Sequence, residues 1–223
     1  MGLAYHPVHS PRLLRRLLPK QLHWQGDPGG SVLYLTFDDG PVPGATPRVL
    51  DILKSFDARA TFFCVGDNAR KYPDLLQRLK EEGHAAGNHT FSHLNGWRTA
   101  TPDYLEDVRK AQALIGGSLF RPPYGRIRPS QVKAIAPEMD IVLWTVLSWD
   151  FHPEVSAGQC LDNVLKFSGS GSVVVFHDSP RCLDKLNRVL PPFLEEFRAK
   201  GFTFEPLTPD RLRNARSDGS SVS

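Results

Sequence analysis

The chain has 223 residues, of which 40% are hydrophobic and 23% are charged. This composition is typical of one globular domain, and because no apolar run reaches the roughly 18 residues of a membrane span, it excludes disordered and membrane-spanning proteins. The net charge of +3 arises in residues 1–26, which contain four basic residues and no acidic one, and leave 23 basic against 24 acidic groups for the rest. The body therefore has no excess of positive charge, which argues against nucleic-acid binding.

Residues 1–30 are predicted to form a basic N-terminal arm ahead of the main domain. Leu13, Leu14, Leu17 and Leu18 recur at helical spacing with arginines between them, which indicates a short amphipathic helix. Packing of this helix on the main domain is favoured over anchoring at a membrane surface. The arm lacks the uninterrupted apolar segment of a signal peptide, so the sequence favours a cytoplasmic location.

From residue 31 onward, apolar strand-like segments alternate with helical patterns. Strands are predicted at 31–37, 60–66, 84–88, 118–122, 140–147, 172–177 and 202–207. The clearest helices are predicted at 47–56, 101–117 and 183–201. Pro191 and Pro192 should break or kink the last helix. Most strands are too apolar for a half-exposed sheet, which indicates parallel strands covered by helices.

This alternation gives seven strands and six helices, which fit either a βα barrel or an open doubly wound sheet. Residues 31–207 are predicted to form the single domain, and residues 208–223 a flexible tail.

Unusual polar residues follow the predicted strands at the points where the strands end. They are Asp38 and Asp39 after the first strand, His89 and His93 after the third, Arg121 to Tyr124 after the fourth, Asp150 after the fifth, and His177 at the end of the sixth. In both candidate architectures the carboxyl ends of the strands share one face, where such folds carry their chemistry. The clustering predicts a functional site on that face.

Three of these residues have the chemistry of a metal site. His89 and His93, in HTFSH, are four residues apart and can face one metal from a helical turn. Taken alone, the pair fits two surface histidines equally well. A carboxylate from the adjacent pair Asp38 and Asp39 would complete a two-histidine, one-carboxylate set with positions left for water and substrate. By itself, however, the Asp-Gly-Pro sequence also fits an Asx turn.

The remaining strand-end residues suggest charged pairs. Arg121 lies in RPPY, where the prolines stiffen the backbone, and its guanidinium can bind a carboxylate bidentately. An ordinary turn with a surface arginine fits that motif equally well. Asp150 alone fits a helix cap and His177 alone fits a core histidine. Because His177 closes a buried strand, it needs a polar partner, which Asp150 can supply.

Taken together, TFDDG, HTFSH, RPPY, WDF and VFH, in this order and each at a predicted strand end, resemble the polysaccharide deacetylase family, also called carbohydrate esterase family 4 or the NodB-homology domain. The resemblance covers residues 31–207. It implies a distorted (β/α)7 barrel that removes N-acetyl groups from N-acetylglucosamine polymers such as chitin or peptidoglycan. Such a substrate would favour the cell envelope as location, in contrast to the N-terminal sequence.

The resemblance also implies a role for each matching residue. Asp38 corresponds to the catalytic base and His177 to the general acid. The implied metal ligands are Asp39, His89 and His93. The implied supporting groups are Arg121, which orients the base, the backbone N–H of Tyr124, which binds the oxyanion, and Asp150, which tunes the pKa of His177. The implied substrate contacts are Phe151 and Val175 around the acetyl methyl group, and Pro122 is a further candidate for substrate contact. Trp149, just before Asp150, fits stacking on a sugar ring and packing within the barrel equally well. The implied cofactor is a divalent metal, with Zn²⁺ the first expectation and Co²⁺ or Ni²⁺ accepted by the same ligands.

The sequence departs from the family pattern around the substrate pocket. Leu147 stands where an additional aspartate is frequent, Phe151 where tryptophan is usual, and Val175 where leucine is usual. None of these changes removes a catalytic group, so they bear on pocket shape and substrate preference. Hydrolysis of O-acetyl esters and binding of carbohydrate without catalysis are the alternatives. The oligomeric state is not indicated by the sequence.

Overall fold

The computed structural model describes residues 8–10 and 18–217, and the side chains within them up to residue 215. Leu13, Leu14 and Leu17 of the predicted amphipathic helix lie outside the described residues, as do residues 218–223 of the predicted tail. None of the helices in the described part of the chain is long and apolar enough to cross a membrane.

One nine-stranded sheet runs through the described residues. Its strands are β1 (Leu22–His23), β2 (Val32–Asp38), β3 (Thr61–Cys64), β4 (Ala85–Asn88), β5 (Leu119–Phe120), β6 (Asp140–Val142), β7 (Val146–Leu147), β8 (Val173–His177) and β9 (Thr203–Phe204). They pair in the order β1-β6-β5-β4-β3-β2-β8-β7, and β9 pairs with the start of β2. Every one of these strand pairs is parallel.

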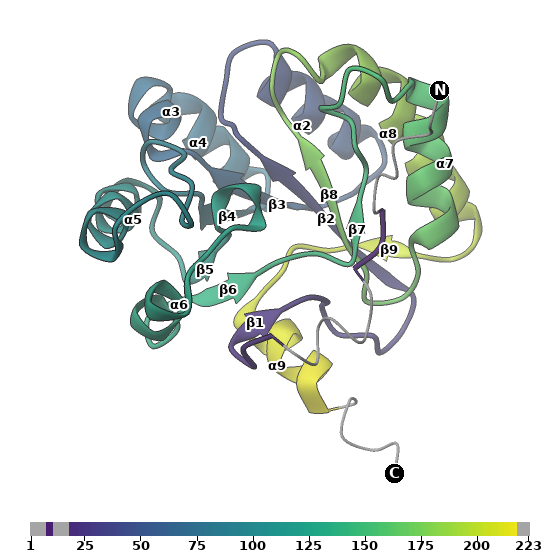
Figure 1. Cartoon of the computed structure of the whole chain (residues 1–223). Coiled ribbons are helices and arrows are strands. Elements are labelled where there is room, and N and C mark those ends of the chain that lie inside the picture. Colours follow the sequence, from purple (N-terminus) through teal and green to yellow (C-terminus); the bar gives the residue numbers. More distant parts are fainter. Residues whose placement is uncertain (1–7, 11–17, 218–223) are drawn as a thin grey trace.

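Helices surround this sheet, which curls into an incompletely closed barrel (Figure 1). They are α2 (Ala45–Ser55), α3 (Gly66–Lys71), α4 (Pro73–Glu81), α5 (Thr101–Ile115), α6 (Pro129–Ile135), α7 (Ala157–Phe167), α8 (Leu183–Ala199) and α9 (Pro209–Ser217), with a 3₁₀ turn η1 at Pro123–Gly125. The predicted α/β fold with a distorted barrel of parallel strands is therefore confirmed.

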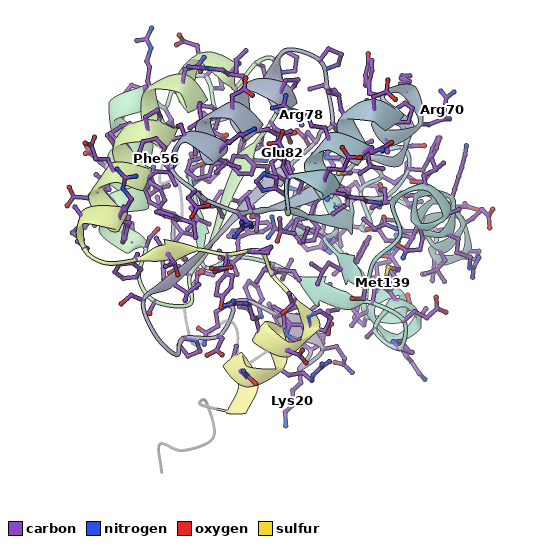
Figure 2. All side chains as sticks on the ribbon, turned by 180° about the vertical axis from the view of Figure 1, so that it is seen from behind. Lys20, Phe56, Arg70, Arg78, Glu82 and Met139 are labelled. Atoms are coloured by element: carbon purple, nitrogen blue, oxygen red, sulfur yellow. The ribbon has the colours of Figure 1, made fainter. Side chains whose placement is uncertain are left out.

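Strand β2 shows why the sequence of the sheet is almost uniformly apolar. Leu33, Leu35 and Phe37 belong to the large hydrophobic cluster that includes residues of α2 and α8. Tyr34, between them, points into a second cluster with Phe63 of β3. Side chains fill both sides of the sheet (Figure 2). Each fully buried leucine or phenylalanine contributes about 1.5–3 kcal/mol to folding, so the core fixes the strands and with them the positions of their ends.

The segment 140–147, predicted as one strand, forms two strands with different neighbours. β6 pairs with β5 and β1, whereas β7 pairs with β8. The residues between them, Leu143 to Thr145, carry the chain from one part of the barrel to the other. Periodicity could not reveal this break, because an apolar run looks the same whichever strand it pairs with.

Three further differences concern the chain ends and α8. The predicted break at Pro191 and Pro192 does not occur, because α8 continues through both and its apolar face is buried in the main cluster. Within the predicted N-terminal arm, residues 22–23 join the sheet as β1. Residues 209–217, predicted as a flexible tail, form α9, since Leu212 is fully buried and anchors this helix.

Candidate active site

The carboxyl ends of the strands surround a cavity of about 360 Å³. Its lining consists of Asp38, Asp39, His89, His93, Tyr124, Arg126, Trp144, Leu147, Trp149, Phe151, Val175, His177 and Arg181. The predicted strand-end residues therefore converge on one site. Of the charged strand-end residues, Arg121 and Asp150 are outside this lining and lie buried behind it, at 0% and 1% exposure.

Asp38 forms a charged pair with Arg121 at the end of β2. Arg121 Nη1 donates a hydrogen bond of 2.8 Å to Asp38 Oδ1, and the side chain of Asp38 is only 6% exposed. The same Nη1 donates to Thr36 Oγ1 at 2.7 Å. Arg121 therefore holds the Asp38 carboxylate from the buried side, and Asp38 lines the cavity on its other side.

Arg121 is held by the break between β6 and β7. Its Nε donates to the Val142 carbonyl at 3.2 Å and its Nη2 to the Leu143 carbonyl at 3.0 Å. Its guanidinium carbon lies 4.1 Å from the centre of the Phe63 ring. Burial lowers the pKa of Arg121 from its usual value, and the Asp38 carboxylate opposes this change. An arginine keeps its charge under such conditions, whereas a lysine readily loses it.

Asp39, His89 and His93 form the group predicted to bind a metal. One ligand atom from each lies within 4.8 Å of the other two. Asp39 Oδ1 is 3.1 Å from His93 Nε2 and 4.0 Å from His89 Nε2. Two imidazole nitrogens and one carboxylate oxygen are a donor set typical of catalytic zinc and related divalent ions. The residues present therefore fit the implied cofactor.

Neighbouring groups orient both histidines. His89 Nδ1 lies 2.7 Å from the Arg121 carbonyl oxygen, which can only accept, so Nδ1 carries the proton and Nε2 keeps its lone pair toward Asp39. His93 Nδ1 is 3.1 Å from the Tyr124 hydroxyl. Burial lowers the pKa of His89 to about 4, although the Asp38 carboxylate opposes it. This favours the neutral imidazole that metal binding requires.

The charge on Asp39 follows from the same cluster. Burial alone would raise the pKa of Asp39, but the hydrogen bond with His93 and the nearby His177 and His89 hold it well below its usual range. Arg181 also reaches Asp39, with Nη2 at 3.3 Å from Oδ2. Asp39 is therefore a carboxylate at neutral pH.

His177 and Asp150 form the second charged pair. Strand register places His177 of β8 directly beside Asp38 of β2. Asp150 Oδ1 lies 2.8 Å from His177 Nδ1, and Asp150 Oδ2 accepts the His177 backbone N–H at 2.8 Å. Burial would lower the pKa of His177, but the charge and hydrogen bond of Asp150 outweigh it and raise the pKa to about 9. His177 is therefore protonated at neutral pH.

Apolar side chains line the other wall of the cavity. The Phe151 ring centre is 4.9 Å from that of His177 and 5.2 Å from that of Trp149. Val175 and Leu147 complete this wall. The structure does not place Pro122 in the lining, because it is buried and its carbonyl instead accepts the Gly125 N–H of the adjacent turn.

Backbone strain is concentrated at the cavity. Six described residues other than glycine have positive φ, and four of them line the cavity: Asp39 at 83°, His93 at 55°, Tyr124 at 62° and Trp149 at 62°. Such conformations cost about 1–3 kcal/mol each and persist where surrounding structure imposes them. The fold therefore sets the direction of these four side chains at a cost in stability.

The sequence did not reveal several supporting residues. Thr36 is the first residue of TFDDG, but the motif gave no sign that its hydroxyl accepts a hydrogen bond from Arg121. Arg181 follows a predicted strand without a motif. Asp178 is fully buried, and it accepts hydrogen bonds from the Thr46 hydroxyl at 2.5 Å and the Gly40 N–H at 3.1 Å. Burial raises the pKa of Asp178 to about 8. Its position directly after a buried strand was the signal available for it.

Comparisons with known proteins agree with this geometry. The sequence profile of the family described as polysaccharide deacetylase matches residues 25–143. The chain is 37% identical over 185 residues to a peptidoglycan-N-acetylglucosamine deacetylase of Bacillus cereus, which covers 78% of this chain and 66% of that protein. It is 36% identical over 161 residues to the peptidoglycan-N-acetylmuramic acid deacetylase PdaC of Bacillus subtilis, across 68% of this chain and 33% of that protein.

A similar solved structure has the same fold. The crystal structure of a peptidoglycan N-acetylglucosamine deacetylase superposes with a TM-score of 0.77 at 34% sequence identity, covering 86% of this chain and 93% of that one. The chain thus spans slightly less than two thirds of the first curated relative and a third of the second. Since the family profile matches more than half of the chain, this chain belongs to the polysaccharide deacetylase family.

Proposed function

We propose that this chain is a metal-dependent deacetylase that removes N-acetyl groups from N-acetylglucosamine residues of a peptidoglycan-type or chitin-type glycan and releases acetate. One observation carries the proposal. Asp38 and His177, at paired positions on β2 and β8, face the same cavity as the Asp39, His89 and His93 cluster, and each has an opposite charge behind it. The similarity to a peptidoglycan-N-acetylglucosamine deacetylase and to the peptidoglycan-N-acetylmuramic acid deacetylase PdaC of Bacillus species supports the same chemistry.

In this proposal Asp39, His89 and His93 hold the divalent cation, with Zn²⁺ the first expectation and Co²⁺ or Ni²⁺ as substitutes. When bound, the cation supplies positive charge that polarises the amide carbonyl and acidifies a water molecule. The neutral His89 and the charged Asp39 are already in the protonation states that bind a cation.

Asp38 acts as the general base. It lines the cavity, and Arg121 holds it in one orientation through a 2.8 Å hydrogen bond. As water attacks the acetyl carbonyl carbon, a proton passes to Asp38. The resulting oxyanion needs hydrogen-bond donors in a site that largely excludes bulk water, and we assign the backbone N–H of Tyr124 to this role.

His177 acts as the general acid. When the tetrahedral intermediate collapses, the C–N bond breaks and the sugar nitrogen must receive a proton, since an amide anion is a very poor leaving group. His177 carries that proton at neutral pH because Asp150 raises its pKa to about 9. Phe151 and Val175 provide an apolar wall for the acetyl methyl group, and Trp149 provides a ring beside it.

The test is acetate release from N-acetylglucosamine oligomers by the purified protein. We expect release that stops after chelation and returns with Zn²⁺ or Co²⁺. His93→Ala should lose both the metal and the activity. Release that is insensitive to chelation would contradict the metal assignment, and absence of release from metal-loaded protein would favour a carbohydrate-binding protein.

Ester hydrolysis and amide hydrolysis can be distinguished by how strongly each depends on the general acid His177. An alkoxide leaves without full protonation, so an O-acetyl ester should depend on His177 less than an amide does. His177→Ala is expected to reduce amide cleavage far more than ester cleavage. An equal loss on both substrates would argue against protonation of the leaving group by His177.

A further inference from the structure

An exposed aromatic and basic surface adjoins the cavity. Trp97 is 58% exposed, which is unusual for tryptophan, and the Arg126 guanidinium carbon lies 5.3 Å from the centre of its ring. Arg128 donates from Nη2 to the Trp97 carbonyl at 2.7 Å. We call Trp97, Arg126 and Arg128 the basic shelf.

Hydrogen bonds fix the basic shelf in place. Trp97 Nε1 donates to the Ile127 carbonyl at 3.2 Å, and the Trp97 backbone N–H donates to Asn95 Oδ1 at 3.0 Å. Gln131 Nε2 donates to the Gly96 carbonyl at 3.0 Å. A Cβ atom on Gly96 would lie 2.3 Å from the Arg126 carbonyl oxygen, so only glycine allows the two loops to approach this closely. The indole is therefore held in its exposed position by its surroundings.

The basic shelf is continuous with the cavity through Arg126, which belongs to both. Tyr124, two residues earlier in the same segment, lines the cavity and is 59% exposed. Trp97 and Tyr124 are two of the four large apolar residues that are exposed in the described part of the chain. Exposed aromatic rings thus extend from the cavity onto the shelf.

The two arginines of the basic shelf differ from several other arginines of the molecule in their ion pairing. Among the residues that the structure describes, no carboxylate forms an ion pair with Arg126 or Arg128. By contrast, Arg70, Arg78 and Arg188 on helices α3, α4 and α8 all have one. Two guanidinium groups beside an exposed indole suit a sugar ring that carries a carboxylate, because the ring's C–H face packs on the indole and the guanidinium binds the carboxylate.

We propose that the basic shelf is a subsite for a carboxylate-bearing sugar next to the N-acetylglucosamine being deacetylated, so that the chain prefers acidic glycans to neutral ones. This inference rests on the proposed function. It favours a peptidoglycan-type substrate over a chitin-type one, because chitin-type oligomers are neutral, whereas peptidoglycan-type strands carry carboxylates. The carboxylate belongs either to a substituent of the sugar or to a peptide attached to it.

Binding, measured without turnover, tests the proposal. The dissociation constants of Asp38→Asn protein are measured for neutral N-acetylglucosamine oligomers, peptide-free peptidoglycan strands and peptide-bearing strands of equal length. We expect acidic strands to bind about tenfold more tightly than neutral ones at low salt. This preference should shrink as NaCl rises from about 20 mM to about 500 mM, because exposed charges are screened. Tight binding of peptide-free strands assigns the carboxylate to the sugar, and tight binding of peptide-bearing strands alone assigns it to the peptide.

Substitutions in the same background connect the preference to the shelf. Arg126→Gln should remove most of the preference for acidic strands, and Arg126→Lys should retain part of it. Trp97→Ala should weaken the binding of neutral and acidic strands to the same extent. Arg70→Gln is the matched control, since Arg70 is an exposed arginine at the edge of the molecule on α3, which contributes nothing to the cavity (Figure 2). It should leave the preference intact.

The outcomes separate the two proposals. Equal binding of neutral and acidic strands, or a preference that survives Arg126→Gln, contradicts the proposal that the basic shelf is a subsite, even if the wild-type protein releases acetate. A preference that depends on Arg126, in a protein that releases no acetate, supports the shelf and contradicts the deacetylase assignment.

Discussion

Each of the two charged pairs of the site joins a carboxylate to a cationic side chain, but the two pairs differ in which partner faces the cavity. In Asp38–Arg121 the cation is fully buried and the carboxylate lines the cavity. In His177–Asp150 the carboxylate is buried and the imidazole lines the cavity. Both pairs are joined by contacts of 2.8 Å. Which partner faces the cavity therefore decides whether a pair offers a proton acceptor or a proton donor.

The pairs also differ in how they respond to pH. Arg121 keeps its charge throughout the neutral pH range, so its hydrogen bond to Asp38 does not depend on pH there. The proton on His177 depends on a pKa of about 9 that Asp150 raises against the effect of burial. The acceptor half of the site is thus fixed, whereas the donor half can be titrated.

The largest effect should follow from neutralising the acceptor. Asp38→Asn keeps the shape of the side chain but cannot take a proton, so we expect kcat/KM for acetate release to fall about 10²–10⁴-fold. Metal content per chain should remain unchanged, because Asp38 is outside the Asp39, His89 and His93 cluster. Activity and bound metal, measured on one preparation, check this. Near-normal deacetylation by this variant would remove Asp38 from the role of base.

The next effect concerns the buried cation. Arg121→Gln leaves the Asp38 carboxylate buried without its counter-charge, and breaking such a pair costs about 3–5 kcal/mol of unfolding free energy. Urea unfolding measures the loss. Arg181→Gln is the control, because Arg181 reaches Asp39 from an exposed position, where ion pairs contribute about 0–1 kcal/mol. The double variant Asp38→Asn with Arg121→Gln should lose less unfolding free energy than the sum of the losses in the two single variants. Strict additivity of the two losses would contradict the coupling between Asp38 and Arg121.

The donor half is tested by Asp150→Asn. The asparagine removes the negative charge that raises the pKa of His177, so that pKa should fall from about 9 toward or below its usual value of 6.5. NMR titration of the His177 ring in metal-free protein measures it directly. If the pKa stays near 9, Asp150 is not its cause.

The same pKa has a consequence for stability. A pKa raised in the folded state adds stability that is complete below pH 6.5, the value in the unfolded chain, and is lost as pH rises toward 9. The difference in unfolding free energy between wild type and Asp150→Asn should therefore narrow between about pH 6.5 and pH 9. A difference that is constant over this window would mean that Asp150 supports the fold only through the His177 backbone N–H.

The sequence predicted the parts of the site that lie at strand ends. Asp38 and His177 could be placed because each follows an apolar run, and parallel strands bring such ends to one face. His89 and His93 could be paired because their spacing is local. These features depend on a few neighbouring residues, which is the range over which periodicity carries information.

What the sequence could not predict depends on long-range pairing. The carbonyls of Val142 and Leu143 bind Arg121 only because the segment 140–147 divides between two parts of the barrel. Leu212 is one apolar residue in a polar segment, and its burial, which makes α9 a helix and not a tail, depends on a distant cluster that includes Tyr34 and Val173. Arg126 and Trp97 meet across two loops that follow RPPY and HTFSH, and neither residue belongs to those motifs.

The smallest effect should come from the hydroxyl behind the acceptor pair. Thr36 Oγ1 accepts from Arg121 and donates to the Val174 carbonyl at 2.9 Å. Thr36→Val keeps the volume and removes both bonds, which should cost about 1–3 kcal/mol of unfolding free energy. Since the bond from Arg121 to Asp38 remains, kcat/KM should fall only a few-fold, and Thr36→Ser should restore both quantities. A loss of activity as large as that of Asp38→Asn would mean that orientation of the carboxylate matters as much as its charge. Thr36, two residues before Asp38 in β2, would then support the base together with Arg121.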